Sequence, residues 1–184
     1  DTQQKTEQNS IKAPLGVYIY GGVGCGKTFM MDLFFEELPI KRKLRAHFNS
    51  FMIDIHKRLY KLKSSSKNTS EESYLERIAT ELMEESYVIC FDEFQVTDIA
   101  DALVLKSLFT ILWQKGCVVV ATSNRPPVDL YKNGLQRVLF VPFIDTVIAN
   151  MQVISMTPSQ IDYRQLKHSA DHSQVTPVLL VLLL

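Results

Sequence analysis

The chain has 184 residues, of which 46% are hydrophobic and 22% are charged, and its 20 basic and 20 acidic residues give a formal net charge of zero at pH 7. This length and hydrophobic content predict one domain with a substantial core and exclude two full-sized domains. Because the charges balance, the composition gives no indication of a nucleic acid or an anionic membrane as the partner.

The apolar run 17–20 is the first predicted strand, and Pro14 and Gly16 mark the entry into it. The polar residues 1–11 ahead of it are expected to form a disordered approach. Directly after the strand comes GGVGCGKT, which matches the phosphate-binding pattern G-x-x-x-x-G-K-[ST]. A helix is predicted at 29–38, because its apolar residues share one helical face and Pro39 ends it.

The sequence of this loop predicts how phosphates are held. Four of the chain's seven glycines lie between Gly21 and Gly26, where backbone N–H groups must curl around an anion in conformations that a Cβ would obstruct. Lys27 is expected to meet the β and γ phosphates, and the hydroxyl of Thr28 to hold Mg²⁺. ATP and Mg²⁺ are therefore the predicted ligands. The predicted nucleotide-binding residues are Gly21, Gly22, Val23, Gly24, Cys25, Gly26, Lys27 and Thr28.

Beyond this unit, predicted strands and helices alternate. They are a strand at 44–48, a helix at 51–62, a polar loop at 64–70, a helix ending near Glu85, a strand at 87–91, a helix at 97–115 and a strand at 117–121. Thr97 is the expected N-cap of the long helix, and the basic run 41–45 is expected to be a solvated edge. The alternation predicts an α/β fold with a doubly wound, mostly parallel sheet, whose ligands bind at the carboxyl ends of the strands.

An acidic pair, Asp92 and Glu93, follows the predicted strand at 87–91. A Mg²⁺-dependent triphosphatase needs one carboxylate near the metal and another beside the attacking water. We therefore expect Asp92 to organise Mg²⁺ and Glu93 to polarise water. Asn124 ends the next strand segment, which would place its amide near the γ-phosphate. By themselves, the two acids also fit a solvated pair at a strand end, and Asn124 also fits a turn.

Arg137 stands in GLQR, after a segment that contains Pro126, Pro127 and Gly134. An arginine supplied across a subunit boundary can stabilise the charge that develops during phosphoryl transfer. From the residues alone, this role and that of an ordinary surface arginine stay equally open. The predicted catalytic set is Lys27, Glu93, Asn124 and Arg137, with Thr28 and Asp92 at the metal.

The cysteines and the C-terminus bear on the environment of the protein. Cys25, Cys90 and Cys117 are odd in number and lack C-x-x-C spacing, which favours a reducing compartment without disulfides. His168 and His172 have the spacing of one helical face, but a third ligand is not evident, so no metal site is expected there. The apolar residues 178–184 are far fewer than the ~20 that cross a bilayer, so no membrane span is predicted.

The strings GVYIYGGVGCGKTFMMDLFF, FDEFQVTDIADA and TSNRPPVDLYKNGLQR, in this order, resemble the ZapE and AFG-one-like ATPases, a branch of the AAA+ superfamily in bacteria and mitochondria. The resemblance covers roughly residues 12–164. It implies that the loop at 21–28 is the Walker A motif and that Asp92 and Glu93 form the Walker B motif. It further implies that Asn124 is the first sensor and Arg137 the arginine finger.

The same resemblance implies a biological setting. Its members are oligomeric, hexameric ATPases that remodel protein clients, in mitochondrial protein homeostasis or in bacterial cell division. The implied compartment is the mitochondrion for a eukaryotic protein and the cytoplasm for a bacterial one. After Asp162-Tyr163-Arg164 the family continues into a helical lid, whereas this chain turns into HSADHSQVTPVLLVLLL. We therefore expect an approach at 1–11, an AAA+ type P-loop core at 12–164 and a divergent tail at 165–184, with the lid missing and turnover impaired.

Four functions remain to be compared. The first is an ATPase that remodels proteins, and the second is a DNA-associated ATPase of the helicase-loader class, which combines similar motifs on the same fold. A small-molecule kinase is disfavoured, because the chain has no obvious acceptor-binding segment. A nucleotide-binding module that does not hydrolyse ATP is the non-enzymatic alternative.

Overall fold

The computed structural model describes residues 13–65 and 70–156. Its strands are β1 (Gly16–Tyr20), β2 (Lys43–His47), β3 (Val88–Asp92), β4 (Val118–Ser123) and β5 (Met151–Ser155). Its helices are α1 (Lys27–Glu37), α2 (Phe48–Ser65), α3 (Glu71–Glu85), α4 (Ile99–Gln114) and α5 (Val141–Asn150), with the short 3-10 helices η1 (Pro127–Asp129) and η2 (Arg137–Leu139). The expected approach at 1–11, the tail at 165–184, the expected missing lid, His168 and His172 lie outside the described residues.

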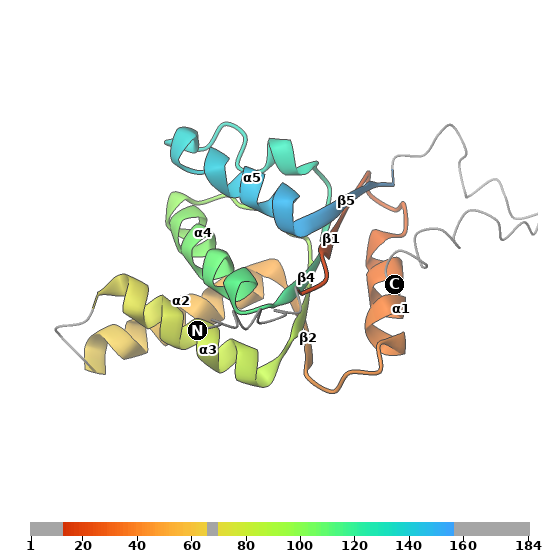
Figure 1. The fold of residues 1–184 in the computed structure, drawn as a ribbon. Helices are drawn as coiled ribbons and strands as arrows, with labels where there is room; N and C mark the ends of the chain where they lie inside the picture. The colour runs from red at the N-terminus through yellow and green to blue at the C-terminus, as the bar shows by residue number, and fades with distance from the viewer. Residues whose placement is uncertain (1–12, 66–69, 157–184) are drawn as a thin grey trace, which may run out of the picture.

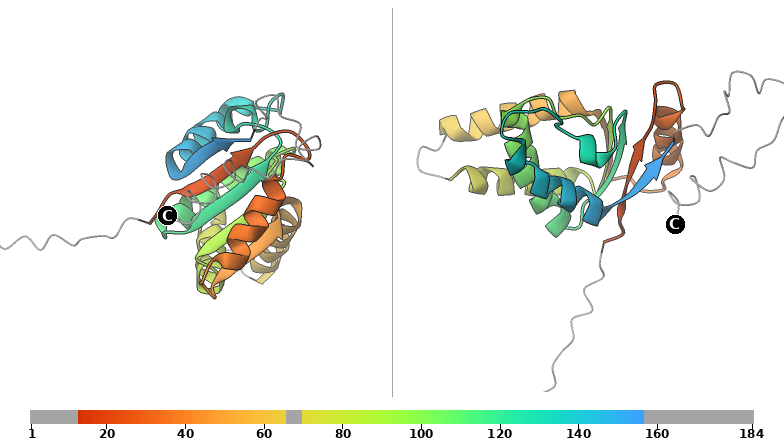
Figure 2. Two further views of the ribbon diagram at one scale, coloured as in Figure 1. Left: turned by 90° about the vertical axis from the view of Figure 1, so that its right-hand side faces the viewer. Right: turned by 90° about the horizontal axis from the view of Figure 1, so that it is seen from above.

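The strands form one parallel sheet in the order β2-β3-β4-β1-β5 (Figure 1). Helix α1 lies on one face of this sheet, and α2 to α5 lie on the other (Figures 1 and 2). Crossovers between parallel strands are right-handed, so the direction in which the chain moves across the sheet decides on which face of the sheet the connecting helix lies. The chain crosses from β1 to β2 in one direction and returns through β3 and β4 to β5 in the other. The predicted doubly wound α/β fold is confirmed.

The larger core lies between the sheet and α2 to α5. Aromatic rings run through it, with the ring centroids of Phe91 and Phe109 5.6 Å apart and those of Phe109 and Phe143 6.0 Å apart. A smaller core under α1 contains Ile19 and Cys90. Because helices cover both faces, all five residues of β3 are buried, which explains its uninterrupted apolar sequence.

The start of α4 differs from the prediction. Its N-cap is Asp98, whose carboxylate accepts a hydrogen bond of 2.6 Å from the backbone N–H of Ala100, so the expectation of Thr97 was wrong. A carboxylate at this position satisfies a free N–H group and also carries negative charge to the positive end of the helix. Helix α2 is longer than predicted, since it begins at Phe48 and continues to Ser65.

The helix α5 and the strand β5 were not among the predicted elements. The stretch 141–155 is mostly apolar, and α5 ends at Asn150 directly before β5 begins at Met151. Pro142 lies in the first turn of α5, where its missing N–H removes no helical hydrogen bond. β5 pairs with β1 from Gly16↔Met151 to Tyr20↔Ser155, and it forms the edge of the sheet beside the glycine loop.

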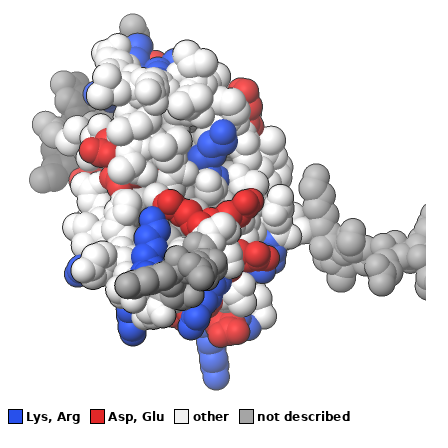
Figure 3. All heavy atoms as spheres, turned by 90° about the vertical axis from the view of Figure 1, so that its left-hand side faces the viewer, with Lys and Arg blue, Asp and Glu red and all other residues white. Residues whose placement is uncertain are grey.

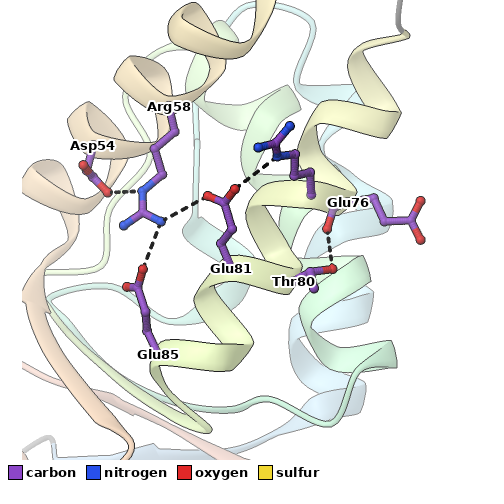
Figure 4. A network of polar contacts seen from close by, with 7 residues as sticks. Asp54, Arg58, Glu76, Thr80, Glu81 and Glu85 are labelled. Carbon is purple, nitrogen blue, oxygen red and sulfur yellow. Dashed lines mark hydrogen bonds and ion pairs between the residues drawn. The ribbon is translucent and has the colours of Figure 1, made fainter.

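Helices α2 and α3 form a hairpin whose far end extends beyond α4 (Figure 1). Arg58 of α2 joins its two helices, because its guanidinium contacts Asp54 on its own helix and Glu81 and Glu85 on α3 (Figure 4). The distances from these carboxylates to the guanidinium are 2.8, 3.8 and 3.3 Å, respectively. One cation therefore links three carboxylates across the packed helix pair.

Candidate active site

The carboxyl ends of β1, β3 and β4 meet at one edge of the sheet, and most predicted site residues lie there. The glycine loop at 21–26 follows β1, Asp92 is the last residue of β3, and Asn124 follows β4. Because β4 lies between β1 and β3, its end stands between the glycine loop and the acidic pair. The arrangement places Thr122 of β4 where it can contact the acidic pair.

The backbone of the glycine loop depends on residues without a Cβ. Gly24 and Gly26 have φ values of 79° and 88°, in the left-handed region that other residues rarely adopt. At Gly21, a Cβ would lie 2.9 Å from the carbonyl oxygen of Met156. Helix α1 begins at Lys27, directly after the loop, so the positive end of its dipole lies at the loop. The loop and the helix end together can hold an anion.

The side chain of Lys27 folds back into the loop, and only 8% of the residue is exposed. Its Nζ donates hydrogen bonds to the carbonyl oxygens of Gly21 and Gly22, at 2.9 and 2.7 Å. Sγ of Cys25 lies 3.7 Å from the same nitrogen. The buried ammonium is therefore satisfied by the carbonyl oxygens of the loop itself.

Asp92 joins the loop to two neighbouring strands, although the residue is only 4% exposed. Its Oδ1 accepts hydrogen bonds from Oγ1 of Thr28, at 3.0 Å, and from Oγ1 of Thr122, at 2.5 Å. Its Oδ2 lies 3.4 Å from Nη2 of Arg45. An ionised carboxylate only accepts hydrogen bonds, and here each of its oxygens faces a donor.

The donor set at Thr28 and Asp92 fits Mg²⁺. A hydroxyl has one hydrogen and two lone pairs, so Thr28 can donate to Asp92 and still offer oxygen to a cation. Mg²⁺ prefers oxygen ligands and is usually held by one or two protein groups, water and phosphate oxygens rather than by a protein cage. The part of the chain that the structure describes has no cluster of three or more His, Cys, Asp or Glu side chains suited to a metal, and such a site requires none.

Glu93 and Asn124 line the same cavity, which has a volume of about 320 Å³ and whose lining includes neither Asp92 nor a residue of the glycine loop. Glu93 is exposed and has a left-handed backbone, with φ of 57°. Its backbone N–H donates to Oγ1 of Thr122 at 3.2 Å. The structure thus brings the predicted water-activating acid and the predicted sensor amide to one cavity, next to Asp92 in the chain.

The segments after β3 and β4 are joined by further hydrogen bonds. Oγ of Ser123 donates to the carbonyl oxygen of Phe94 at 2.8 Å and accepts from the backbone N–H of Arg125 at 3.3 Å. The hydroxyl of Tyr18 donates to the carbonyl oxygen of Arg125 at 2.9 Å. Burial raises the pKa of Tyr18, so this hydroxyl stays a donor. These contacts hold Asn124 between two anchored neighbours.

Arg137 lies apart from this group. It begins η2, and its Nη2 donates to the carbonyl oxygen of Val128 at 2.6 Å. Among the described residues, no hydrogen bond or ion pair connects it with the glycine loop or with the acidic pair. Its neighbours Leu135 and Val138 are 77% and 81% exposed.

The basic run at 41–45 is not a uniformly solvated edge, so that expectation was wrong for Arg42, Lys43 and Arg45, which are half-buried. Lys43 and Arg45 are half-buried, because alternation along β2 turns both toward α1. Nζ of Lys43 donates to the carbonyl oxygens of Phe35 and Leu38 at the end of α1. Arg45 forms an ion pair with Asp32 of α1, and this hydrogen bond is the main cause that raises the pKa of Arg45.

Two of these site residues had no predicted role, namely Arg45 and Thr122. Arg45 could have been recognised from its alternation with Lys43 in a strand that follows a helix with an acidic side chain. Thr122 precedes Asn124 by two positions and is the last residue but one of β4. Its contacts depend on which strands are neighbours, and the local sequence does not contain that information.

None of the helices formed by the described residues combines the length and the apolar character needed to cross a membrane.

Comparison with known proteins identifies relatives. The sequence model of the family described as AFG1-like ATPase matches residues 2–178. The chain is 50% identical over 167 residues to Lactation elevated protein 1 homolog B of Danio rerio, which covers 88% of this chain and 33% of that protein. It is 42% identical over 163 residues to the Cell division protein ZapE of Escherichia coli (strain K12), which covers 89% of this chain and 42% of that protein.

These matches also set the extent of the likeness. The chain spans about a third to two fifths of the length of these relatives. Among solved structures, AMPPCP-bound DnaA from Aquifex aeolicus superimposes with a TM-score of 0.54 and 13% identity, over 93% of this chain and 52% of that one. At this identity the likeness concerns the fold, whereas the sequence matches identify the family. The chain belongs to the AFG1-like ATPase family.

Proposed function

We propose that this chain is the nucleotide-binding core of an ATPase, which binds ATP with Mg²⁺ and hydrolyses it to ADP and phosphate. The observation that carries the proposal is the hydrogen bond between Thr28, which follows the glycine loop, and Asp92, at the end of β3. This contact joins the phosphate-binding loop to a carboxylate at the place where a metal would bridge them. Family membership supports the same activity.

The glycine loop and Lys27 hold the phosphates. The backbone N–H groups of the loop and the amino end of α1 supply positive charge, and the ammonium of Lys27 moves from the loop carbonyls to phosphate oxygens. Thr28 and Asp92 would hold Mg²⁺, which would neutralise charge on the phosphate oxygens. The relative named DnaA is described with the nucleotide analogue AMPPCP, which fits a nucleotide site on this fold.

Glu93 acts on the attacking water. As the water oxygen forms its bond to the γ-phosphorus, Glu93 accepts one proton from the water, the bond to the β-phosphate oxygen breaks, and ADP leaves. The amide of Asn124 lines the same cavity and orients the water or a γ-phosphate oxygen. The exposure of Glu93 allows water to reach it.

Arg137 acts in a neighbouring subunit's site rather than in its own. Its separation from the glycine loop and the exposed apolar residues around it support this assignment. A homo-oligomer, hexameric by family resemblance, would cover those residues.

The clients are proteins, and the compartment follows the source, mitochondrial in a eukaryote and cytoplasmic in a bacterium. One relative is named a cell division protein, and that name supports a division-associated role for a bacterial source. Acidic and basic side chains are interspersed on the face drawn in Figure 3, where no broad basic surface suited to DNA is visible. A DNA-associated ATPase remains the alternative that the experiment must address.

The test combines binding with turnover. In the wild type, calorimetry with Mg²⁺ should detect ATP binding, and a phosphate-release assay should detect hydrolysis. Glu93→Gln should keep ATP affinity within about threefold and lower kcat by about 100-fold or more, because the carboxylate acts only on the water. Lys27→Ala should lose binding. Wild-type protein that is folded and binds no ATP would contradict the proposal, and stimulation by single-stranded DNA but not by unfolded protein would favour the DNA-associated class.

A further inference from the structure

Thr122 contacts three consecutive residues of the segment that carries the acidic pair. Its Oγ1 donates to Oδ1 of Asp92 at 2.5 Å and accepts from the backbone N–H of Glu93 at 3.2 Å. Its carbonyl oxygen accepts from the backbone N–H of Phe94 at 2.7 Å. Thr122 is only 1% exposed, so these groups satisfy its buried polar atoms.

The chemistry of the two side chains fixes which group donates and which accepts in these hydrogen bonds. The Thr122 hydroxyl has a single hydrogen, and the Asp92 carboxylate has no donor, so that hydrogen goes to Asp92. The lone pairs of the same oxygen then receive the N–H of Glu93. The hydroxyl thus forms a bridge from the side chain of Asp92 to the main chain of Glu93.

The bridge lies where regular pairing between β3 and β4 stops. The last registered pair of these strands is Phe91↔Ala121. Two residues later, Glu93 adopts its left-handed φ of 57°, a conformation that costs free energy for a residue with a Cβ. Thr122 takes over from the strand pairing, because it bonds the N–H groups on both sides of the Cα of Glu93. Thr122 therefore bonds both sides of the bend that turns Glu93 away from the strand, and Ser123 adds a hydrogen bond to the carbonyl oxygen of Phe94 just beyond it.

We propose that Thr122 is a positioning residue whose hydroxyl fixes the two acids relative to each other, Asp92 toward the metal and Glu93 toward the water. This inference rests on the proposed ATPase function and adds to it a residue from a third segment. Without the hydroxyl, Oδ1 of Asp92 keeps only Thr28 as a donor, and the carboxylate can rotate. The N–H of Glu93 loses its partner, and the bend loosens.

The chain offers a matched set of variants. Thr122→Val keeps the shape and β-branching of the side chain and removes the hydroxyl, whereas Thr122→Ser keeps the hydroxyl and removes a methyl group. Thr110→Val is the control, because it removes a hydroxyl that bonds only the carbonyl oxygen of Lys106 within α4. Thermal unfolding of each variant shows whether it is folded, and Thr122→Ala replaces Thr122→Val if that variant is not.

The decisive readout is the effect of Mg²⁺ on nucleotide affinity, measured by calorimetry with ADP in EDTA and again with Mg²⁺. Thr122→Val should bind ADP in EDTA within about twofold of wild type, since it does not touch the phosphate loop. Its gain in affinity on adding Mg²⁺ should fall about fivefold or more, the scale of a lost hydrogen bond to a charged group. In steady-state hydrolysis of ATP with Mg²⁺ present, the kcat of Thr122→Val should fall about tenfold or more, and its KM should change less. Thr122→Ser should restore both quantities, and Thr110→Val should match wild type.

The outcomes separate the two proposals. The positioning role would be overturned if Mg²⁺ increased the ADP affinity of Thr122→Val as much as that of the wild type. It would also be overturned if Thr122→Ser were as impaired as Thr122→Val. If the wild type shows the Mg²⁺ gain but no hydrolysis, the proposed ATPase activity of this chain fails while the Mg²⁺ readout still decides the role of Thr122. If the folded wild type binds no nucleotide, both proposals are overturned.

Discussion

Thr28 and Asp92 lie 64 residues apart in the sequence, yet Oγ1 of Thr28 is 3.0 Å from Oδ1 of Asp92. The contact joins the first turn of α1 to the end of β3, across the end of the intervening strand β4. It places a hydroxyl and a carboxylate where a divalent cation and a triphosphate would meet.

This relationship predicts the effect of Asp92→Asn. The variant should lose about tenfold or more of the affinity that Mg²⁺ adds to nucleotide binding, because an amide is a weaker ligand than a carboxylate and partly turns donors toward the cation. Binding in EDTA should be unchanged or tighter, since a negative charge near the phosphates is removed. Calorimetry with ADP measures both. Asp54→Asn, an equivalent change on α2, is the control, and a normal Mg²⁺ gain in Asp92→Asn would count against the metal assignment.

A second prediction concerns Arg137 and subunit mixing. Arg137→Ala and Glu93→Gln should each be inactive alone, and mixtures of the two should recover part of the phosphate release. Recovery is expected because a site formed by an intact Glu93 on one subunit and an intact Arg137 on its neighbour is complete. Mixing Glu93→Gln with Lys27→Ala provides the control.

In that control, the Lys27→Ala subunit cannot bind ATP and the Glu93→Gln subunit cannot use it, so no site is complete. Failure to recover activity at any ratio of Arg137→Ala to Glu93→Gln would contradict action across a subunit boundary.

A third prediction concerns stability at alkaline pH. Burial raises the pKa of Cys90 and of Cys117 from the ordinary 9.0 to about 12 in the folded protein. Between pH 9 and 12 the unfolded chain loses these protons while the folded chain keeps them, so the free energy of unfolding must fall as pH rises. Each thiol should contribute up to about 1.4 kcal/mol per pH unit in this window and nothing below pH 8.

Denaturant titrations across this pH range measure the slope. In Cys117→Ala the free energy of unfolding, compared with the value of the same variant at pH 7, should fall less steeply with pH, because one of the two thiols is absent. An unchanged slope in Cys117→Ala would show that its thiol ionises equally well in the folded and unfolded chains.

A fourth prediction concerns the ion network between α2 and α3 (Figure 4). Arg58→Met should lower the free energy of unfolding by about 1 kcal/mol, because it removes contacts to three carboxylates that are 41–54% exposed at their side chains. The loss should shrink in 1 M salt, since partly exposed ion pairs are screened. Lys57→Met, an exposed position on the same helix, should change stability by less than about 0.5 kcal/mol. A loss from Arg58→Met that salt leaves unchanged would assign the effect to packing of its alkyl chain instead.

Much of the fold could be predicted from local patterns. The continuously apolar stretches at 17–20 and 87–91 predict buried parallel strands, and GGVGCGKT predicts the loop between the first strand and its helix. These features succeed because burial on both faces and phosphate cradling each impose a residue pattern over a short range. Helix α5 and strand β5 escaped prediction, because no loop separates them in the mostly apolar stretch 141–155, so the pattern does not reveal where one element ends.

The sequence by itself determined that Asp92 and Glu93 end a buried strand and that a glycine loop with Lys27 and Thr28 follows another. Only the tertiary structure decided that Thr28, Asp92 and Thr122 share hydrogen bonds and that Arg45 reaches both Asp32 and Asp92. The physical reason is that residue type and spacing describe each strand end separately. Which ends meet depends on the order β2-β3-β4-β1-β5, and this order results from the handedness of the crossovers and from packing across the whole sheet.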